Sequence, residues 1–586
     1  MTRPTRRALL ALALAAAPAA LAQAPADTYV VNQFGAPVTL DPARNYDSAS
    51  SEIIENLYET LYTYDGEAID AFVPQLATGY EVSEDGTVYT FTLREGVPFH
   101  SGNTLTCRDV EYSFERGFVT AHPEGAFSYL LGAQLLGTQT DGTDPEAYQQ
   151  EVSFADIDGA IECPDGDDGL TVQFTLRQAD PAFLSIIVYS AFSIVDSQWA
   201  IENGMWDGTE ATWTEWIGRD LTQEFMQNQA SGTGAYRLVS WETNSLIAER
   251  FDDYWGGAPA LEAVVYNYVD EQATNILALT QGDADRIVLG DRAGLAQLRG
   301  APGVRVVEQN EAGEPFLTTV VTSIFFNYDI NTANNEDVGS GQLDGNGIPA
   351  DFFQDENVRL GFAHLFDQQA FVDQVLEGQG QALTMGLPPT FLGYNPDVEI
   401  RTLDLEAAEE HFRAAYGGEL WDTGFQFTAL YNEGNTARQI ALQIIAQNLS
   451  ELNPNFRMNV RGLPWADYLS RTDQRLAPLF ALGWAADYAD PRNFINTFYS
   501  NEGFYAARTS IDFPEMQALI DQANSIIDQE ERAALYQEIG QLHYELAPLI
   551  IVPAQFDYLA VRENLQGYYY NPMLSGNFFW KDLSKN

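Results

Sequence analysis

Two cysteines and five histidines are the residues that could most directly supply nucleophilic or metal-binding chemistry. The histidines are spread along the chain without the close spacing of metal ligands, and neither cysteine lies in a local protease signature. Cys107 and Cys163 therefore have two interpretations, a disulfide or two buried free thiols. The five histidines, which we expect to be surface or structural residues, are His100, His122, His364, His411 and His543.

Longer catalytic motifs are also missing from the sequence. It contains no H-E-x-x-H, no G-x-S-x-G, no phosphate-binding Walker loop and no dinucleotide-binding G-x-G-x-x-G after a strand. With 84 acidic residues, a pair of catalytic carboxylates has no distinguishing signature. Asp344 and Asn346 resemble a calcium loop only faintly, so we expect residues 331–352 to form a long polar surface loop. The sequence thus predicts no enzyme activity, metal or cofactor, and a secreted hydrolase with an unrecognised carboxylate site remains the alternative from another class.

The charge balance excludes several partners. The chain has 29 basic and 84 acidic residues and a net charge of −55, and its only lysines are Lys581 and Lys585. Such a surface repels nucleic acid and anionic lipid head groups. We interpret the acidity as a solubility or salt adaptation and expect no nucleic-acid binding.

The first residues have the pattern of a cleaved signal peptide, predicted to cover residues 1–22. Arg3, Arg6 and Arg7 precede an Ala/Leu-rich stretch, and Ala20-Leu21-Ala22 fits a cleavage site. Export to the periplasm would place the two cysteines in an oxidising compartment, which favours a Cys107–Cys163 disulfide. Closing a loop of that length stabilises a fold by about 4 kcal/mol in the chain-entropy model.

Strand and helix patterns alternate along the rest of the chain. Residues 80–93 predict a β-hairpin that turns at Asp85-Gly86, and Thr106 with Asp109 predicts a capping box at the start of a helix. Alternating apolar residues predict a strand over 170–176.

A strand-helix-strand unit is predicted further along. Alternating apolar residues mark strands at 425–429 and 456–460, and Asn435 can cap the helix between them. This order favours a partly parallel sheet and an α/β fold. A further helix over 405–416 is predicted to begin after Asp404 and to end at Gly417-Gly418.

Several short blocks occur in an order typical of one family. Together they span nearly the whole chain after the signal peptide, and they are Thr39-Leu-Asp-Pro42, Glu55-Asn-Leu-Tyr-Glu-Thr-Leu61, Pro74-Gln-Leu-Ala77, Tyr89-Thr-Phe-Thr-Leu-Arg-Glu-Gly96, Phe99-His-Ser-Gly102, Asp109-Val-Glu-Tyr-Ser-Phe114, Gly232-Thr-Gly-Ala-Tyr236, Tyr254-Trp255, Asn357-Val-Arg359, Phe366-Asp367 and Gly483-Trp-Ala-Ala-Asp-Tyr-Ala-Asp-Pro491. On these blocks the chain resembles the family 5 extracellular solute-binding proteins of ABC importers, which include peptide, oligopeptide and nickel binders.

The resemblance implies a two-lobed periplasmic-binding-protein fold of type II, in which hinge closure engulfs a ligand. Lobe I would be discontinuous and would carry an extra subdomain. The implied ranges are 23–72, 231–308 and 546–586 for lobe I, 73–230 for the subdomain and 309–545 for lobe II. The implied function is to capture peptides between the lobes and deliver them to the membrane subunits of an ABC permease, with the binding protein acting as a monomer.

The resemblance also implies a ligand site. Asp487 corresponds to the family's acidic residue that pairs with a peptide α-amine, and a buried ammonium needs such a partner. Main-chain groups of Gly483 and Ala485 would pair with the ligand backbone. Trp484 and Tyr488 would line the pocket, and Tyr46 lies in a region that supplies contacts from lobe I.

One departure leaves the ligand class open. Some oligopeptide binders carry an arginine for the ligand carboxylate three residues before this tryptophan, where the present chain has Ala481. An oligosaccharide binder of the same fold is therefore the alternative, with Trp465, Trp484 or Tyr431 stacking on sugar rings. Nickel or haem import is disfavoured because the histidines form no cluster.

Overall fold

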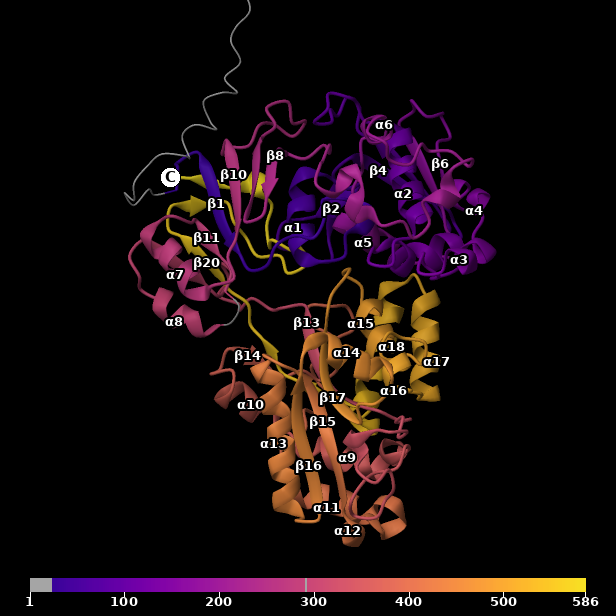
Figure 1. Cartoon of the computed structure of the whole chain (residues 1–586), viewed down its shortest axis with the longest axis vertical. Coiled ribbons are helices and arrows are strands. Elements are labelled where there is room, and N and C mark those ends of the chain that lie inside the picture. Colours follow the sequence, from indigo (N-terminus) through magenta and orange to yellow (C-terminus); the bar gives the residue numbers. More distant parts are fainter. Residues whose placement is uncertain (1–23, 290–291) are drawn as a thin grey trace, which may run out of the picture.

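The computed structural model describes residues 24–289 and 292–586 (Figure 1). The predicted signal peptide lies outside the described residues. Among those residues, no helix is long and apolar enough to cross a membrane.

Lobe I is built on a seven-stranded sheet of order β12-β20-β11-β1-β10-β9-β8. Its strands are β1 (Thr28–Gln33), β8 (Tyr236–Glu242), β9 (Ser245–Arg250), β10 (Ala263–Tyr268), β11 (Arg286–Ile287), β12 (Val304–Val307) and β20 (Leu559–Arg562). Strand β1 runs parallel to both neighbours, and its alternating side chains cover both faces: Tyr29 and Val31 join one core while Val30 joins another. The main helices of lobe I are α1 (Ser48–Leu57), α7 (Gln272–Gln281) and α8 (Leu295–Leu298). Indigo, magenta and yellow segments meet in this body in Figure 1, so three distant parts of the chain form it.

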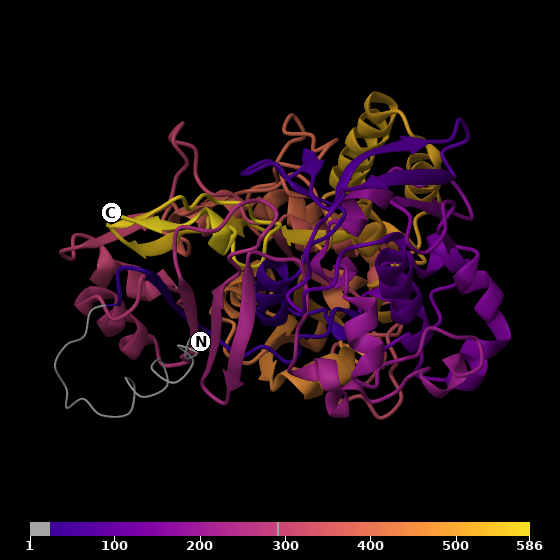
Figure 2. The same ribbon diagram turned by 90° about the horizontal axis from the view of Figure 1, so that it is seen from above.

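A subdomain lies beside this sheet, as Figures 1 and 2 both show. It contains a four-stranded sheet of order β4-β5-β7-β6. Its elements are β4 (Ala77–Val82), β5 (Val88–Leu93), β6 (Ile161–Glu162), β7 (Thr171–Thr175), α2 (Cys107–Thr120), α3 (Pro145–Glu151), α4 (Phe154–Asp158), α5 (Phe183–Ile187) and α6 (Ser197–Glu202). The predicted hairpin is confirmed by the β4–β5 pair, whose turn needs the positive φ of 71° at Gly86. The predicted capping box is present, because Asp109 accepts a hydrogen bond from the Thr106 backbone at 2.8 Å.

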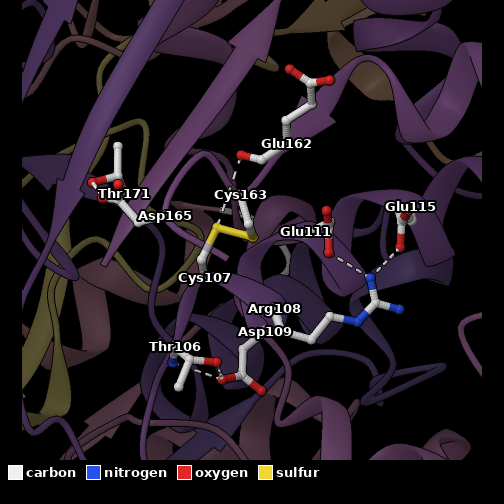
Figure 3. Close-up of a disulfide and its surroundings, with 10 residues drawn as sticks. All are labelled: Thr106, Cys107, Arg108, Asp109, Glu111, Glu115, Glu162, Cys163, Asp165 and Thr171. Carbon is white, nitrogen blue, oxygen red and sulfur yellow. Dashed lines mark hydrogen bonds and ion pairs between the residues drawn. A yellow bond between two sulfur atoms is a disulfide. The ribbon is translucent and has the colours of Figure 1, made fainter. Parts of the chain in front are cut away.

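The predicted disulfide is confirmed (Figure 3). Cys107 at the first turn of α2 is bonded to Cys163, which follows β6, across 56 residues of sequence. It fastens the main helix of the subdomain to the edge of its sheet. On the next turns of α2, Arg108 bridges Glu111 and Glu115 at 2.6 and 2.9 Å.

Lobe II is built on a five-stranded sheet of order β16-β15-β17-β13-β18. Its strands are β13 (Val320–Phe326), β15 (Phe425–Asn432), β16 (Phe456–Leu463), β17 (Leu479–Ala485) and β18 (Leu549–Val552). The predicted strand-helix-strand unit is confirmed, since β15 and β16 pair in parallel and α13 (Thr436–Leu452) connects them with Asn435 as its cap. The other helices of lobe II are α9 (Glu356–Ala363), α10 (Gln368–Gln374), α11 (Leu405–Ala414), α12 (Leu420–Thr423), α14 (Trp465–Asp473), α15 (Arg492–Tyr499), α16 (Ala506–Thr509), α17 (Pro514–Ser525) and α18 (Gln529–Leu546).

Residues 331–352 differ from the plain surface loop that we expected. Val338 and Ile348 are buried in the core of lobe II, and the buried Asp337 forms ion pairs with Arg461 and Arg471. The segment is therefore anchored, because its few apolar residues and one carboxylate find partners that only the folded lobe provides. Asp344 itself is satisfied by Ser340 and by the Asn346 backbone.

Two linkers join the lobes and run side by side. The first leads from β12 to β13, and the second leads from β18 to β20 through β19 (Ala554–Gln555), which pairs with β14 (Gly380–Gln381). Asp557 donates its backbone N–H to Phe316 of the first linker at 2.8 Å. We expected lobe I to resume at residue 546, yet β18 still belongs to the sheet of lobe II, where it pairs with β13.

Candidate functional site

A cavity of about 740 Å³ lies between the lobes. Tyr46, from the segment before α1, lines it on the side of lobe I, and Gly483, Trp484, Ala485 and Asp487 line it on the side of lobe II. The subdomain and the C-terminal segment supply the remaining walls. Five of the six predicted ligand residues thus meet at one cavity, although Tyr46 is 441 residues from Asp487 in sequence.

Asp487 lies where strand β17 gives way to helix α15. Its two carboxylate oxygens accept bonds from opposite sides: Tyr46 Oη donates to Oδ1 at 2.9 Å, and Asn493 Nδ2 donates to Oδ2 at 2.8 Å. The Tyr46 bond crosses from lobe I to lobe II, so these lobes are in contact at the carboxylate.

The orientation of Asn493 is fixed by a second set of bonds. Its Oδ1 accepts the Asp487 backbone N–H at 3.0 Å and the Trp484 indole N–H at 3.1 Å. Because Oδ1 already accepts two donors, Nδ2 must face the Asp487 carboxylate. Asn493 therefore positions both the acidic residue and the tryptophan.

Aromatic rings surround this carboxylate. The Tyr46 ring lies 6.0 Å from Tyr129 and 6.4 Å from Tyr189, and Tyr129 lies 6.4 Å from Trp484 across the lobe boundary. Phe504 packs on Trp484 at 4.7 Å. These faces provide apolar contact area, and the tyrosine hydroxyls supply polar contacts at the same wall.

Burial raises the pKa of Asp487 from 3.8 to about 6, against the hydrogen bonds from Asn493 and Tyr46, which lower it. Those hydrogen bonds come from neutral donors, and no cation forms an ion pair with the carboxylate among the described residues. A carboxylate held this way is suited to bind an ammonium group, which would supply the missing charge.

The main chain beside Asp487 is partly available for pairing. Strand β17 pairs with β13 along its length but with β15 only at Phe480, so Gly483 and Ala485 have no strand partner on that side. The Gly483 carbonyl already accepts a bond from Tyr505 Oη at 2.9 Å.

The structure places the sixth predicted ligand residue away from the cavity. Tyr488 is 6% exposed and packs in the core, because its side chain points back toward Arg492 rather than toward the cleft. Trp465 and Tyr431, named for sugar stacking, do not line the cavity either. The position at which some oligopeptide binders carry an arginine is occupied here by Ala481, which is fully buried and offers no base.

Several residues of the site had no signal in the sequence. Tyr129 and Tyr189 come from the subdomain and reach the cavity only through the fold. Asn493 lies two residues beyond the Gly483–Pro491 block, and its closeness to that block is the only signal in the sequence that could have pointed to it.

A buried ion pair also joins lobe II to the subdomain. Arg492 at the start of α15 donates to Asp180 at 2.8 Å, and the Asp180 side chain is 2% exposed. Together with the Tyr46–Asp487 bond, this contact links lobe II to lobe I and its subdomain. Among residues 24–289 and 292–586, no group of histidine, cysteine and carboxylate side chains could hold a metal ion.

These features define a two-lobed α/β protein with a cavity between the lobes and a carboxylate, Asp487, at its wall. The model of the bacterial extracellular solute-binding proteins, family 5, matches residues 71–506. The chain belongs to this family, which confirms the resemblance and the fold class.

Individual relatives are distant but align over their full length. The dipeptide-binding protein of Escherichia coli is 24% identical, with 94% of each chain covered. Heme-binding protein A of Haemophilus influenzae is also 24% identical, covering 93% of this chain and 90% of the relative. Among solved structures, the periplasmic binding protein DppA of Helicobacter pylori in complex with the peptide STSA is 23% identical, with a TM-score of 0.69 over 95% of this chain and 98% of that one.

Proposed function

We propose that this protein is the substrate-binding component of an ABC importer and that it captures short peptides by their α-amine. The observation that carries the proposal is the Asp487 carboxylate, which faces the cleft and is held by Tyr46 and Asn493 without a cation. The relatives support the same ligand class, since the E. coli protein is a dipeptide-binding protein and the H. pylori protein was solved with the peptide STSA.

Capture would proceed by closure of the two lobes. The ligand amine would bind Asp487 of lobe II, while Tyr46, Tyr129 and Tyr189 would contact the ligand from the other side. Ligand favours the closed state through contacts that exist only when both walls meet. Strand-like pairing with the free edge of β17 would hold peptides independently of their side chains.

The proposal includes the compartment and the partners. Residues 1–22 would direct export, and the disulfide is consistent with an oxidising periplasm. A monomer would deliver its ligand to the permease subunits of the importer. Sugar binding is less well supported, because Trp465 and Tyr431 do not line the cavity and Trp484 alone of the three stacking candidates does.

The test uses protein that has been unfolded and refolded to remove carried ligand. Melting temperature is measured with a pool of short peptides and with a pool of oligosaccharides. A ligand at a hundredfold above its Kd stabilises the fold by about 2.7 kcal/mol, which shifts the transition clearly. A shift with peptides supports the proposal, and a shift with oligosaccharides alone overturns it. Turnover of either pool would favour the hydrolase alternative.

A further inference from the structure

The charged side chains that line the cavity are nearly all acidic. Asp47, Asp141, Asp487 and Asp557 contribute carboxylates, and His122 contributes the one imidazole. No arginine or lysine appears among the lining residues. The four carboxylates come from α1, from the subdomain, from lobe II and from the second linker, so they surround the cavity rather than cluster on one element.

The acidic excess of the whole chain does not explain which groups the cavity carboxylates have as partners. Many buried carboxylates elsewhere have a cationic partner, as in the pairs Asp41–Arg116 at 2.5 Å and Asp285–Lys585 at 2.7 Å. The cavity carboxylates accept hydrogen bonds from neutral groups instead. Asp141, which is partly exposed, accepts the Thr143 backbone N–H at 2.8 Å.

Asp47 carries an oxygen without any partner. Its Oδ1 caps helix α1 by accepting the Ser50 backbone N–H at 2.9 Å, whereas its Oδ2 is buried and accepts no hydrogen bond. An unsatisfied buried carboxylate oxygen is costly, but this one has almost no accessible surface, so a ligand in the cavity does not reach it in this conformation.

Asp557 likewise forms no ion pair with a cation in the described part of the chain. It accepts bonds from the Tyr558 backbone N–H at 2.8 Å and from Tyr570 Oη at 3.1 Å, and burial raises its pKa. The nearby arginines are engaged elsewhere: Arg286 pairs with Glu52, and Arg292 pairs with Glu308.

His122 does not offset this charge. Its Nδ1 accepts the Glu124 backbone N–H at 3.1 Å, and burial lowers its pKa, so the ring is neutral at pH 7. The lining therefore presents carboxylates, neutral polar groups and aromatic rings.

We infer that the cleft selects cationic peptides, in which an arginine or lysine side chain adds a second positive charge to the α-ammonium. The inference rests on the proposed function and narrows its ligand class. The ammonium binds Asp487, and the basic side chain is neutralised by Asp557 or Asp141. A ligand with one positive charge would leave most of the lining carboxylates without a cationic partner.

The experiment compares peptides that differ in charge but hardly in shape. Refolded, ligand-free protein is titrated by calorimetry with Ala-Arg-Ala, with Ala-citrulline-Ala, whose side chain is a neutral near-isostere of arginine, and with Ala-Glu-Ala. We expect the arginine peptide to bind at least about tenfold more tightly than the citrulline peptide, equivalent to about 1.4 kcal/mol. The glutamate peptide should bind most weakly, and the arginine preference should shrink as salt is added.

Variants then locate the preference. Asp557→Asn and Asp141→Asn should each reduce the ratio of arginine to citrulline affinity, and the double variant should reduce it most. Asp344→Asn, on an exposed segment of lobe II remote from the cavity lining, serves as the matched control and should leave the ratio unchanged. Melting temperature without ligand checks that each variant is folded.

The outcomes distinguish a failure of the charge selection from a failure of the proposed function. Equal affinity for the arginine and citrulline peptides, or preference for the glutamate peptide, overturns the charge selection while peptide binding stands. Binding of none of the peptides overturns the proposed function and the charge selection together. A preference for arginine that persists in the double variant assigns it to other groups and overturns the role of Asp557 and Asp141.

Discussion

Replacing Asp487 by asparagine is the most informative single change, because it removes the charge and keeps the shape. The carboxylate has two acceptor oxygens facing two donors, Tyr46 Oη and Asn493 Nδ2. An asparagine offers one acceptor and one NH₂ group. Since the Asn493 amide is fixed by two other bonds, one donor would face the new NH₂ group and that bond would be lost.

The expected loss of affinity follows from the proposed charge pair. Removing one member of a buried, hydrogen-bonded charge pair at an interface typically costs about 2–5 kcal/mol. Peptide affinity should therefore fall by at least about 30-fold. Stability without ligand should change in the opposite direction, because a buried carboxylate with a raised pKa is costly at neutral pH. The rise in pKa from 3.8 to about 6 corresponds to about 3 kcal/mol, an upper limit on the gain from neutralising the group.

The assay compares one peptide with a free α-amine and the same peptide with an acetylated amine. Calorimetry on the wild type should show strong discrimination between them, and Asp487→Asn should lose it. Asn493→Ala serves as a second variant: it keeps the charge but releases its orientation, so discrimination should weaken without disappearing. Wild-type discrimination retained in Asp487→Asn would refute the amine-anchor reasoning, whatever the absolute affinity.

Four further outcomes are expected. Peptide affinity should be highest near pH 7 and fall up to tenfold per pH unit below about pH 6, as Asp487 becomes protonated. It should also fall above about pH 8, as the peptide α-amine loses its proton. Calorimetry across pH 4–9 measures this, and an unchanged affinity at pH 4.5 would contradict it. In the same window, protonating Asp487 should stabilise the unliganded protein, because its pKa is higher in the folded state than in the unfolded one. Replacing Cys107 and Cys163 by serine opens a bridge over 56 residues and should cost about 4 kcal/mol in urea unfolding, and a change below 1 kcal/mol would show that the bridge contributes little. Asp180→Asn removes the charge that pairs with Arg492 across the lobes. Peptide affinity should therefore fall about tenfold, and the radius of gyration from X-ray scattering should rise. An unchanged affinity and radius would show that the pair does not favour closure.

Local structure was predictable where short-range physics decides it. The turn at Asp85-Gly86 follows from a backbone that glycine adopts at little cost, and Asn435 and Asp404 cap their helices because their side chains reach backbone N–H groups a few residues away. The helix from Leu405 ends at Ala414, two residues before the predicted end, since Tyr416 already has a left-handed backbone. Such errors at helix ends reflect how little free energy separates one terminal residue from the next.

The ordered sequence blocks determined more than their local structure. They predicted the family, the two-lobed fold and the position of Asp487. Asp487 could be placed because the residues of its turn, Gly483–Pro491, lie within one short segment of the sequence. The even pair of cysteines predicted a bridge once export was inferred, and the structure confirms it between Cys107 and Cys163.

Only the tertiary structure decided what surrounds the anchor. Tyr129, Tyr189 and Asp557 reach the cavity from the subdomain and the second linker, and no spacing in the sequence relates them to Asp487. The same holds for the place of Tyr488, which is one residue from Asp487 yet points into the core. Whether a side chain faces ligand or core depends on the packing of the chain segments on either side of it, and those segments come together only when the whole chain has folded.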